Sequence, residues 1–371
     1  MAQQRGRAAA DERAALPTSH GPLPLPAFLP DGTRGVVRTV APEDLRLVGI
    51  RGVMANSLHL AHQPGTRSIQ QLGGLHAFMG WEGPIATDSG GFQVYSFLAG
   101  RTPMASVSDR GFAYRLPPQR RKRLLTPEGA IENQLRLGAD IVFCLDYCTH
   151  PVAGADVQAE SVRLTLAWAA RSKLAFTAQL ERRASGGPRP LLFAVVQGGE
   201  SEELRRRCAE GLLEIGFDGF GFGGWPASEE GRIVDSVAVV ARLLPPGAPK
   251  HALGIGRPES IVAAWAEGYR LFDCTLPTRN ARRGLAYQRK PGVPASADER
   301  FYSVIDLHDE RWTRDARPLD EACECPCCTR FSRAYLAHLF RLEEALGLRL
   351  ATLHNLRFFT ALLEELGPGE R

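Results

Sequence analysis

Short apolar runs, each ended by Gly, Pro, Asn or Asp, recur along this chain and alternate with stretches that suit amphipathic helices. Runs that are apolar throughout are typical of strands buried on both faces, and helical connections are typical of parallel pairing. The runs lie at residues 27–40, 48–56, 84–90, 141–146, 191–198, 219–224, 251–256 and 271–277. About eight such units within roughly 260 residues favour closure into a (β/α)8 barrel over an open sheet.

Helical stretches separate most of these runs. They are predicted at residues 127–137, 161–180, 202–215 and 258–269. The first has the clearest start, because Thr126 can cap its N-terminus through the side-chain oxygen and Pro127 suits the first helical turn. These helices are expected to cover the outer face of the sheet.

Polar residues stand where the predicted strands end. A single strand-end Asp is commonly a turn former or a helix cap, but polar groups on several separate strands of a barrel converge on one rim. The C-terminal rim is also where the active sites of such barrels are built. The residues are Asn56, Asp88, Asp146, Gln197, Gly223, Gly224, Gly254 and Asp273.

The pattern changes after residue 295. Charged sequence leads into a group of four cysteines and then into two predicted helices, at residues 331–346 and 350–366. We therefore expect a flexible extension at 1–20, a catalytic barrel at 21–295, and a metal-binding subdomain with closing helices at 296–371.

The cysteine group has the spacing of a metal site. Cys323, Cys325 and Cys328 lie on one short segment, and His354 follows after 25 intervening residues. Three thiolates and one imidazole suit tetrahedral zinc, and four protein ligands leave no open position for catalysis, so the zinc is expected to be structural. Cys327 also lies in this segment and could replace a neighbouring cysteine as ligand.

Charge and hydropathy indicate what kind of partner and location the protein has. The formal net charge of +4 is only mildly basic, so a polyanionic partner would have to meet local patches, with candidates at residues 120–123, 205–207 and 279–283. Without an apolar run of about 18 residues or a signal-peptide core, we expect a cytoplasmic protein that does not span a membrane.

Five motifs together resemble the tRNA-guanine transglycosylase family, from about Gly21 to the C-terminal helix. They are Asp88-Ser-Gly-Gly-Phe-Gln93, Val196-Gln-Gly-Gly199, Phe272-Asp-Cys274, Pro277-Thr-Arg-Asn-Ala-Arg282 and the zinc pattern, in which the resemblance selects Cys328. The resemblance implies exchange of guanine at the wobble position of tRNA for a 7-deazaguanine base in queuosine biosynthesis. It also implies a homodimer in which the second subunit helps to hold the tRNA.

The resemblance assigns the catalytic pair by motif. Asp273 corresponds to the nucleophile, which attacks the ribose C1′ and forms a covalent ribosyl-aspartate intermediate. Asp88 corresponds to the general acid/base, and two carboxylates in different environments can divide these roles. Asn56 is expected to hydrogen-bond near Asp88.

The resemblance also places a purine pocket and a tRNA contact. Asp146 corresponds to the reader of the donor edge of the base, while Gln197 and the backbone of Gly224 correspond to the groups at its carbonyl oxygen. Phe92 is expected to stack on the base, with Leu253 as the opposite wall. Contacts to the anticodon loop are assigned to Arg279 and Arg282.

Two departures from the family concern the incoming base. Tyr147 stands where many bacterial relatives have Glu, and Trp225 with Pro226 replaces a smaller loop sequence. Because Trp225 is large and Pro226 restricts the backbone, the expected substrate is a small 7-deazaguanine such as preQ1 rather than the bulky queuine.

Three other functions share some of these features. Base exchange on DNA is disfavoured by the Arg-Asn-Ala-Arg segment together with the zinc pattern. A non-catalytic tRNA-binding subunit is disfavoured because both Asp88 and Asp273 are present. A glycoside hydrolase also uses two carboxylates, but the zinc pattern and only five Trp fit sugar-chain binding poorly.

Overall fold

The computed structural model describes residues 15–98, 105–116, 119–150, 152–182, 188–227 and 232–367. Residues 1–14 of the predicted extension, and the side chains of Arg120 and Arg121 in a predicted basic run, lie outside the described residues.

Eight parallel strands form a barrel, as predicted, and each predicted run overlaps one strand. The strands are β3 (Ala27–Pro30), β4 (Val53–Asn56), β5 (Ile85–Asp88), β9 (Ile141–Phe143), β10 (Leu191–Val196), β11 (Gly219–Phe222), β12 (Lys250–Ala252) and β13 (Leu271–Cys274). Their order is β3-β13-β12-β11-β10-β9-β5-β4. A parallel bridge between Asp31 and Met54 joins the end of β3 to β4, so the sheet closes on itself.

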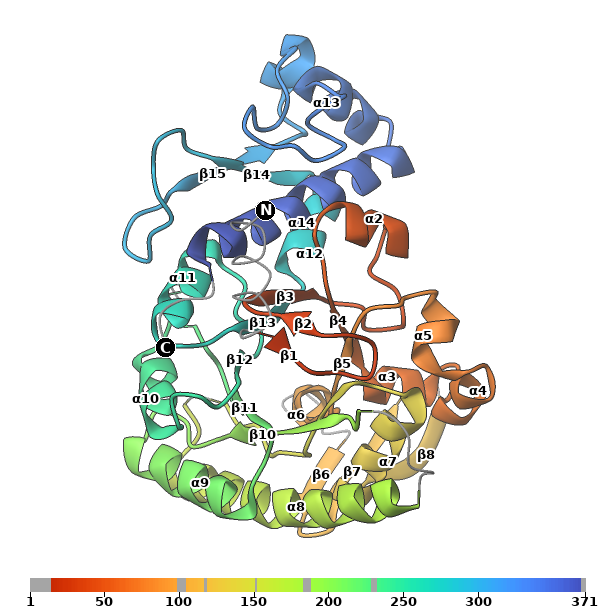
Figure 1. Ribbon diagram of the computed structural model, residues 1–371, viewed down its shortest axis with the longest axis vertical. Helices are drawn as coiled ribbons and strands as arrows, with labels where there is room; N and C mark the ends of the chain where they lie inside the picture. Colours follow the sequence, from red (N-terminus) through yellow and green to blue (C-terminus); the bar gives the residue numbers. More distant parts are fainter. Residues whose placement is uncertain are drawn as a thin grey trace, which may run out of the picture.

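Helices surround the strands (Figure 1). The helices as far as α12 are α2 (Pro42–Leu47), α3 (Ser57–His62), α4 (Thr66–Gln71), α5 (Gly74–Met79), α6 (Gly91–Leu98), α7 (Pro127–Leu137), α8 (Ala155–Glu181), α9 (Glu202–Ile215), α10 (Asp235–Leu243), α11 (Pro258–Ala266) and α12 (Leu276–Arg282). Of these, α6 falls within the outline of the strands in Figure 1 and does not belong to the surrounding layer. The bounds of α7 and α9 agree with the prediction, and the Thr126 side chain caps α7 by accepting a hydrogen bond from the backbone N–H of Gly129. Helix α8 begins six residues earlier than predicted, and α11 ends three residues earlier.

A three-stranded antiparallel sheet between α6 and α7 was not predicted. It consists of β6 (Ala105–Ser108), β7 (Gly111–Leu116) and β8 (Gln119–Leu125). Phe112 is fully buried and packs edge-on against Trp168 of α8, with ring centroids 5.0 Å apart. The alternation of buried Phe112 and Tyr114 with more exposed neighbours is the sequence signal that this segment carried.

A hairpin of β1 (Ala15–Leu16) and β2 (Leu23–Pro24) packs against the barrel interior, where Leu23 is fully buried, and it overlies the ring of strands in Figure 1. Asp140 joins this hairpin to α5. Its carboxylate contacts His20 Nδ1 at 2.9 Å and His76 Nε2 at 3.1 Å, and it accepts the backbone N–H of Ile85 at 2.9 Å. Although burial opposes ionisation, these hydrogen bonds hold the pKa of Asp140 below its usual range.

The C-terminal part pairs β14 (Leu285–Arg289) with β15 (Tyr302–Asp306), followed by the 3-10 helix η2 (Glu310–Arg314), α13 (Arg333–Arg341) and α14 (Ala345–Leu366). Helix α14 returns to the barrel and lies between α11 and α2 in Figure 1. Its Phe359 meets Phe28 of β3 with ring centroids 4.9 Å apart, and Arg349 forms an ion pair with the buried Asp44 of α2. The last long helix therefore completes the outer layer of the barrel.

Among the described residues, no helix is both long enough and apolar enough to cross a membrane.

Candidate active site

The predicted rim residues meet at one cavity of about 670 Å³ at the C-terminal ends of the strands. The cavity is lined by Asn56, Asp88, Phe92, Asp146, Gln197, Gly224, Trp225, Leu253, Asp273 and Arg279. Arg282 lies one turn further along α12 and does not line this cavity. Burial and the neighbouring Arg38 lower the pKa of Arg282.

Asp273 stands near the end of β13 with its two carboxylate oxygens in different surroundings. Oδ1 lies 2.9 Å from Nε2 of His251 and accepts the backbone N–H of Gly254 at 3.1 Å. Within the described part of the chain, no group donates a hydrogen bond to Oδ2. This oxygen is therefore the one available to a substrate in the cavity.

Asp88 ends β5 and is held by three donors. Asn56 Nδ2 donates to Oδ2 at 2.6 Å, Gln93 Nε2 donates to the same oxygen at 3.2 Å, and the backbone N–H of Ser57 donates to Oδ1 at 3.1 Å. The orientation of the Asn56 amide follows from its own oxygen, which caps α3 by accepting the N–H of His59.

Burial raises the pKa of Asp88 to about 7, against the hydrogen bonds from Ser57 and Gln93 and with a further increase from the negative charges of Asp273 and Asp31. A carboxyl group with this pKa can both give and take a proton near neutral pH. The two carboxylates of the cavity are thus placed in environments that favour different roles.

Asp146 and Gln197 form a polar wall. They follow β9 and β10, and Gln197 Nε2 donates to Asp146 Oδ2 at 2.6 Å, while the hydroxyl of Ser89 donates to Oδ1 at 3.4 Å. Burial raises the pKa of Asp146 to about 6, so this carboxylate is mostly ionised at neutral pH and accepts hydrogen bonds. A planar ring with adjacent N–H donors and a carbonyl oxygen matches such a wall.

Aromatic side chains stand at the mouth of the cavity. Phe92 of α6 and Trp225, which follows β11, are 50% and 41% exposed, and their ring centroids are 6.1 Å apart. Tyr95 and His150 also contact the Trp225 ring, with centroids 6.3 Å and 5.7 Å away. Trp225 therefore faces the cavity rather than packing away from it.

Arg205 is a site-forming residue that sequence reasoning misplaced. The run at residues 205–207 was expected to be a surface patch, but Arg205 is only 1% exposed. Its guanidinium donates to the carbonyls of Val196, Gly199 and Gly223, at 2.6, 2.9 and 2.8 Å, and burial lowers its pKa to about 10. It thereby joins the ends of β10 and β11, from which Gln197 and Gly224 follow.

The sequence did contain a signal for this burial. Arg205 shares one helical face with the fully buried Cys208, Ala209 and Leu212, a spacing of three, four and seven residues that is typical of a core-facing helix side. His251 was not singled out from the sequence either, because it is the first residue of a predicted strand and not one of the polar residues that follow the strands.

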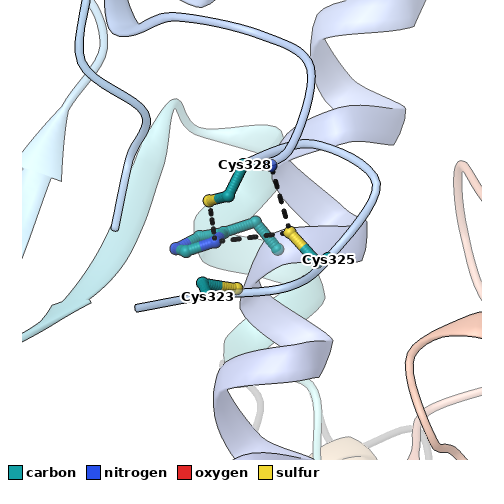
Figure 2. A group of neighbouring side chains, drawn as sticks. Cys323, Cys325 and Cys328 are labelled. Carbon is teal, nitrogen blue, oxygen red and sulfur yellow. Dashed lines mark hydrogen bonds between the residues drawn. The ribbon is translucent and has the colours of Figure 1, made fainter. Parts of the chain in front are cut away.

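The four predicted metal ligands converge in the C-terminal part. The sulfurs of Cys323, Cys325 and Cys328 and a ring nitrogen of His354 all lie within 4.8 Å of one another. Figure 2 shows the three cysteines gathered from one loop beside a helix. His354 Nδ1 lies 3.2 Å from Cys328 Sγ and 3.8 Å from Cys325 Sγ.

The surroundings of this group also fit a metal site. Nε2 of His354 contacts the backbone carbonyl of Tyr287 in β14, and such a contact leaves Nδ1 as the ligating nitrogen. Cys327 is fully buried but does not belong to the converging four. Three thiolates and one imidazole could hold a metal ion in tetrahedral coordination.

His20, His76 and Asp140 form a second converging group, at the other end of the barrel. The Asp140 oxygens there already accept N–H groups from the backbone of His20 and Ile85 and contact both rings, which stack with centroids 3.4 Å apart. Parallel stacked rings direct their nitrogens side by side rather than toward one ion. This group is a hydrogen-bonded link between the hairpin and α5.

The chain matches a family model described as "Queuine tRNA-ribosyltransferase" over residues 9–367. Proteins called queuine tRNA-ribosyltransferase from Nitrosospira multiformis and Thioalkalivibrio sulfidiphilus are 42% identical over 358 residues and 40% identical over 360 residues. The alignments cover 95% and 96% of this chain and 90% of each relative. A protein of the same name from Methylacidiphilum infernorum is 39% identical over 355 residues, covering 95% of this chain and 89% of that protein.

Proposed function

Because the chain belongs to the queuine tRNA-ribosyltransferase family, we propose that it exchanges guanine at the wobble position of tRNA for a 7-deazaguanine base, through a covalent ribosyl-aspartate intermediate in queuosine biosynthesis. The observation that carries the proposal is the pair of carboxylates, Asp88 and Asp273, which line one cavity in different environments.

In the first step, Oδ2 of Asp273 attacks the ribose C1′, and the bond from C1′ to guanine N9 breaks. The leaving base takes the bonding electron pair, and protonated Asp88, with its pKa of about 7, supplies a proton to it. The phosphate backbone is untouched. The product of this step is a ribosyl ester of Asp273 and a free guanine.

In the second step, N9 of the incoming base attacks C1′ and displaces the Asp273 carboxylate. The base gives up its N9 proton to Asp88, which is restored to its protonated form. One displacement with a poor leaving group is thereby divided into two easier displacements, and no net proton is consumed.

The polar wall supports selection of a guanine-like base. The Asp146 carboxylate is suited to accept the ring N–H and the exocyclic amine, and the Gln197 amide and the backbone N–H of Gly224 are suited to donate to the carbonyl oxygen. Phe92 at the mouth and Leu253 on the wall supply flat apolar contacts. Arg279, exposed at the cavity, suits a contact to a phosphate of the anticodon loop, and Arg282 is proposed to contribute to the same surface.

A small incoming base, such as preQ1, is favoured over queuine. The 7-substituent of a base held by Asp146 and Gln197 would extend toward the loop after β11, where Trp225 and Phe92 restrict the space. An aminomethyl group needs little room and can donate to the Trp225 carbonyl. The direct test is competition of preQ1 and queuine against labelled guanine, and queuine incorporated as fast as preQ1 would refute the preference.

We propose zinc as the metal of the Cys3His group, in a structural role. Bound zinc would tie the loop that carries Cys323, Cys325 and Cys328 to His354 on α14, the helix that completes the outer layer of the barrel. A homodimer formed near this region is proposed from the family, and the mass of the protein in solution tests it.

Incubation of purified protein with labelled guanine, in separate reactions with tRNA and with DNA, tests the function. Label should enter tRNA alone, and uptake into DNA or into neither polymer would overturn the proposal. Wild-type protein mixed with tRNA should form an adduct that survives denaturing gels, whereas Asp273→Asn should form none, because an amide of nearly the same shape is a poor nucleophile. Exchange by Asp273→Asn above a few per cent of wild type would refute the assignment of the nucleophile.

A further inference from the structure

We propose that His251 is a positioning residue for Asp273: as a neutral Nε2–H donor it holds Oδ1, so that Oδ2 is the oxygen presented to the sugar. This inference rests on the proposed function, since it concerns how the nucleophile of that reaction is aimed.

The contact comes from two neighbouring strands. His251 lies in β12, which pairs with β13 so that His251 stands beside Leu271, and its Nε2 reaches Asp273 Oδ1 at 2.9 Å. The side chain is 0% exposed, and its ring packs edge-on against Phe143 with centroids 5.6 Å apart. Packing on this scale leaves the imidazole little freedom to leave the carboxylate.

The surroundings of the ring select its protonation state. Nδ1 of His251 is buried and has no hydrogen-bond partner among the described residues. An N–H at Nδ1 would therefore be a buried donor without an acceptor, which costs about 1–3 kcal/mol, and more for a charged ring. The form with a proton on Nε2 alone leaves only a lone pair without a partner at Nδ1, and it presents a donor to Asp273, whereas a lone pair at Nε2 would face the carboxylate and repel it.

Both donors to Asp273 use the same oxygen. The backbone N–H of Gly254 also reaches Oδ1, at 3.1 Å, and among the described residues none donates to Oδ2. Two donors on one oxygen fix the rotation of the carboxylate, and an oxygen without hydrogen bonds keeps its lone pairs for attack. The arrangement therefore distinguishes the attacking oxygen from the anchored one before substrate arrives.

The same contacts serve the second displacement. In the ribosyl ester, Oδ2 is bonded to C1′ and Oδ1 is the carbonyl oxygen, still within reach of His251 and Gly254. When the incoming base breaks the bond from C1′ to Oδ2, the electron pair returns to the carboxylate, and the two donors stabilise the charge that appears there. His251 neither gains nor loses a proton in this cycle.

Two substitutions separate positioning from packing. His251→Gln keeps an N–H donor near the place of Nε2, whereas His251→Met fills similar space without a donor. We expect His251→Met to lower kcat for guanine exchange by about 10- to 100-fold, the effect of losing one hydrogen bond to a charged group, with KM for tRNA within about twofold of wild type. His251→Gln should keep kcat within about fivefold of wild type, and formation of the covalent adduct should slow in His251→Met by the same factor as kcat.

His76→Met is the matched control. It removes another histidine contact to an aspartate, Nε2 to Asp140 at 3.1 Å, at the opposite end of the barrel. We expect it to lower the melting temperature and to leave kcat unchanged below that temperature. If His251→Met keeps the kcat of wild type, or if His251→Gln loses as much as His251→Met, the side chain acts through packing and the inference is overturned.

A measurement without turnover keeps the inference distinct from the proposed function. Histidine-selective ¹⁵N spectra of the wild-type protein should contain one Nε2-protonated ring that disappears in His251→Gln and changes its shift in Asp273→Asn. If guanine is not exchanged but this signal is found, the proposed function fails while the contact stands. If the His251 ring is protonated at Nδ1, alone or together with Nε2, the inference is overturned whether or not guanine is exchanged. It is also overturned if the His251 signal is unaffected by Asp273→Asn.

Discussion

Asp88→Asn should raise the stability of the protein at neutral and alkaline pH, relative to wild type, while it removes guanine exchange. Burial and the charges of Asp273 and Asp31 raise the pKa of Asp88 from the ordinary 3.8 to about 7 in the folded protein. At a pH between 3.8 and about 7, Asp88 therefore keeps its proton in the folded protein but has lost it in the unfolded chain. Stability that comes from the protonated form is complete below about pH 4 and is lost as the pH rises through about 7.

The size of the effect follows from the same values. Each unit of difference between the folded and the unfolded pKa corresponds to about 1.4 kcal/mol. Ionisation of Asp88 therefore lowers the free energy of unfolding by about 4 kcal/mol. Asparagine carries no charge and escapes this cost. Its amide cannot accept from all three donors that Asp88 serves, but that loss does not depend on pH. Between about pH 5 and about pH 8, the free energy of unfolding of Asp88→Asn should therefore gain about 2.5 kcal/mol on wild type.

Urea unfolding of both proteins at the two pH values measures this difference. Asp44→Asn is the control, because the ion pair with Arg349 holds the pKa of the buried Asp44 below its usual range despite desolvation, so Asp44 is charged throughout this pH interval. The difference between Asp44→Asn and wild type should be the same at both pH values. An equally constant difference for Asp88→Asn would refute the argument that Asp88 is protonated near neutrality.

Three further changes test other parts of the molecule. Cys323→Ser or His354→Ala should abolish binding of about one zinc per chain and unfold the C-terminal part, and a variant that keeps the wild-type melting temperature without metal would contradict a structural site. Arg205→Met should cost about 2–4 kcal/mol of unfolding free energy, because buried carbonyls lose their donor, while Arg206→Met on the exposed side of α9 should change it by less than about 0.5 kcal/mol; equal losses would remove the role given to Arg205. Trp225→Gly should raise kcat/KM for queuine relative to preQ1 by at least about tenfold, and an unchanged ratio would show that Trp225 does not limit the 7-substituent.

Local sequence was sufficient for the barrel and for the rim. Strands buried on both faces must be apolar throughout, so the eight runs could be recognised without any knowledge of their partners. Asn56, Asp88 and Asp273 could be placed together because parallel strands of a barrel end on the same side. The close spacing of Cys323, Cys325 and Cys328, followed by His354 after 25 residues, likewise indicated a metal site, and the four side chains converge in the structure.

Contacts between distant segments required the tertiary structure. Arg205 belongs to a run of three arginines, and nothing in that run states that its charge lies among the carbonyls of two strand ends. Helix α14 reads as part of a separate appendage, yet its Phe359 packs on Phe28 of β3, more than 300 residues earlier. Such pairings depend on which surfaces meet after the barrel has closed, and local periodicity does not contain that information.

The different environments of Asp88 and Asp273 are the clearest example of a property that depends on the tertiary structure. Asp88 and Asp273 are the same residue type at equivalent strand ends, and the sequence identifies both as acids near a cavity. Burial and two neighbouring carboxylates raise the pKa of Asp88 against the hydrogen bonds that it accepts, while His251 and Gly254 anchor one oxygen of Asp273 and leave the other open. Desolvation and hydrogen-bond geometry are properties of the assembled site, because each depends on atoms from strands far apart in the chain.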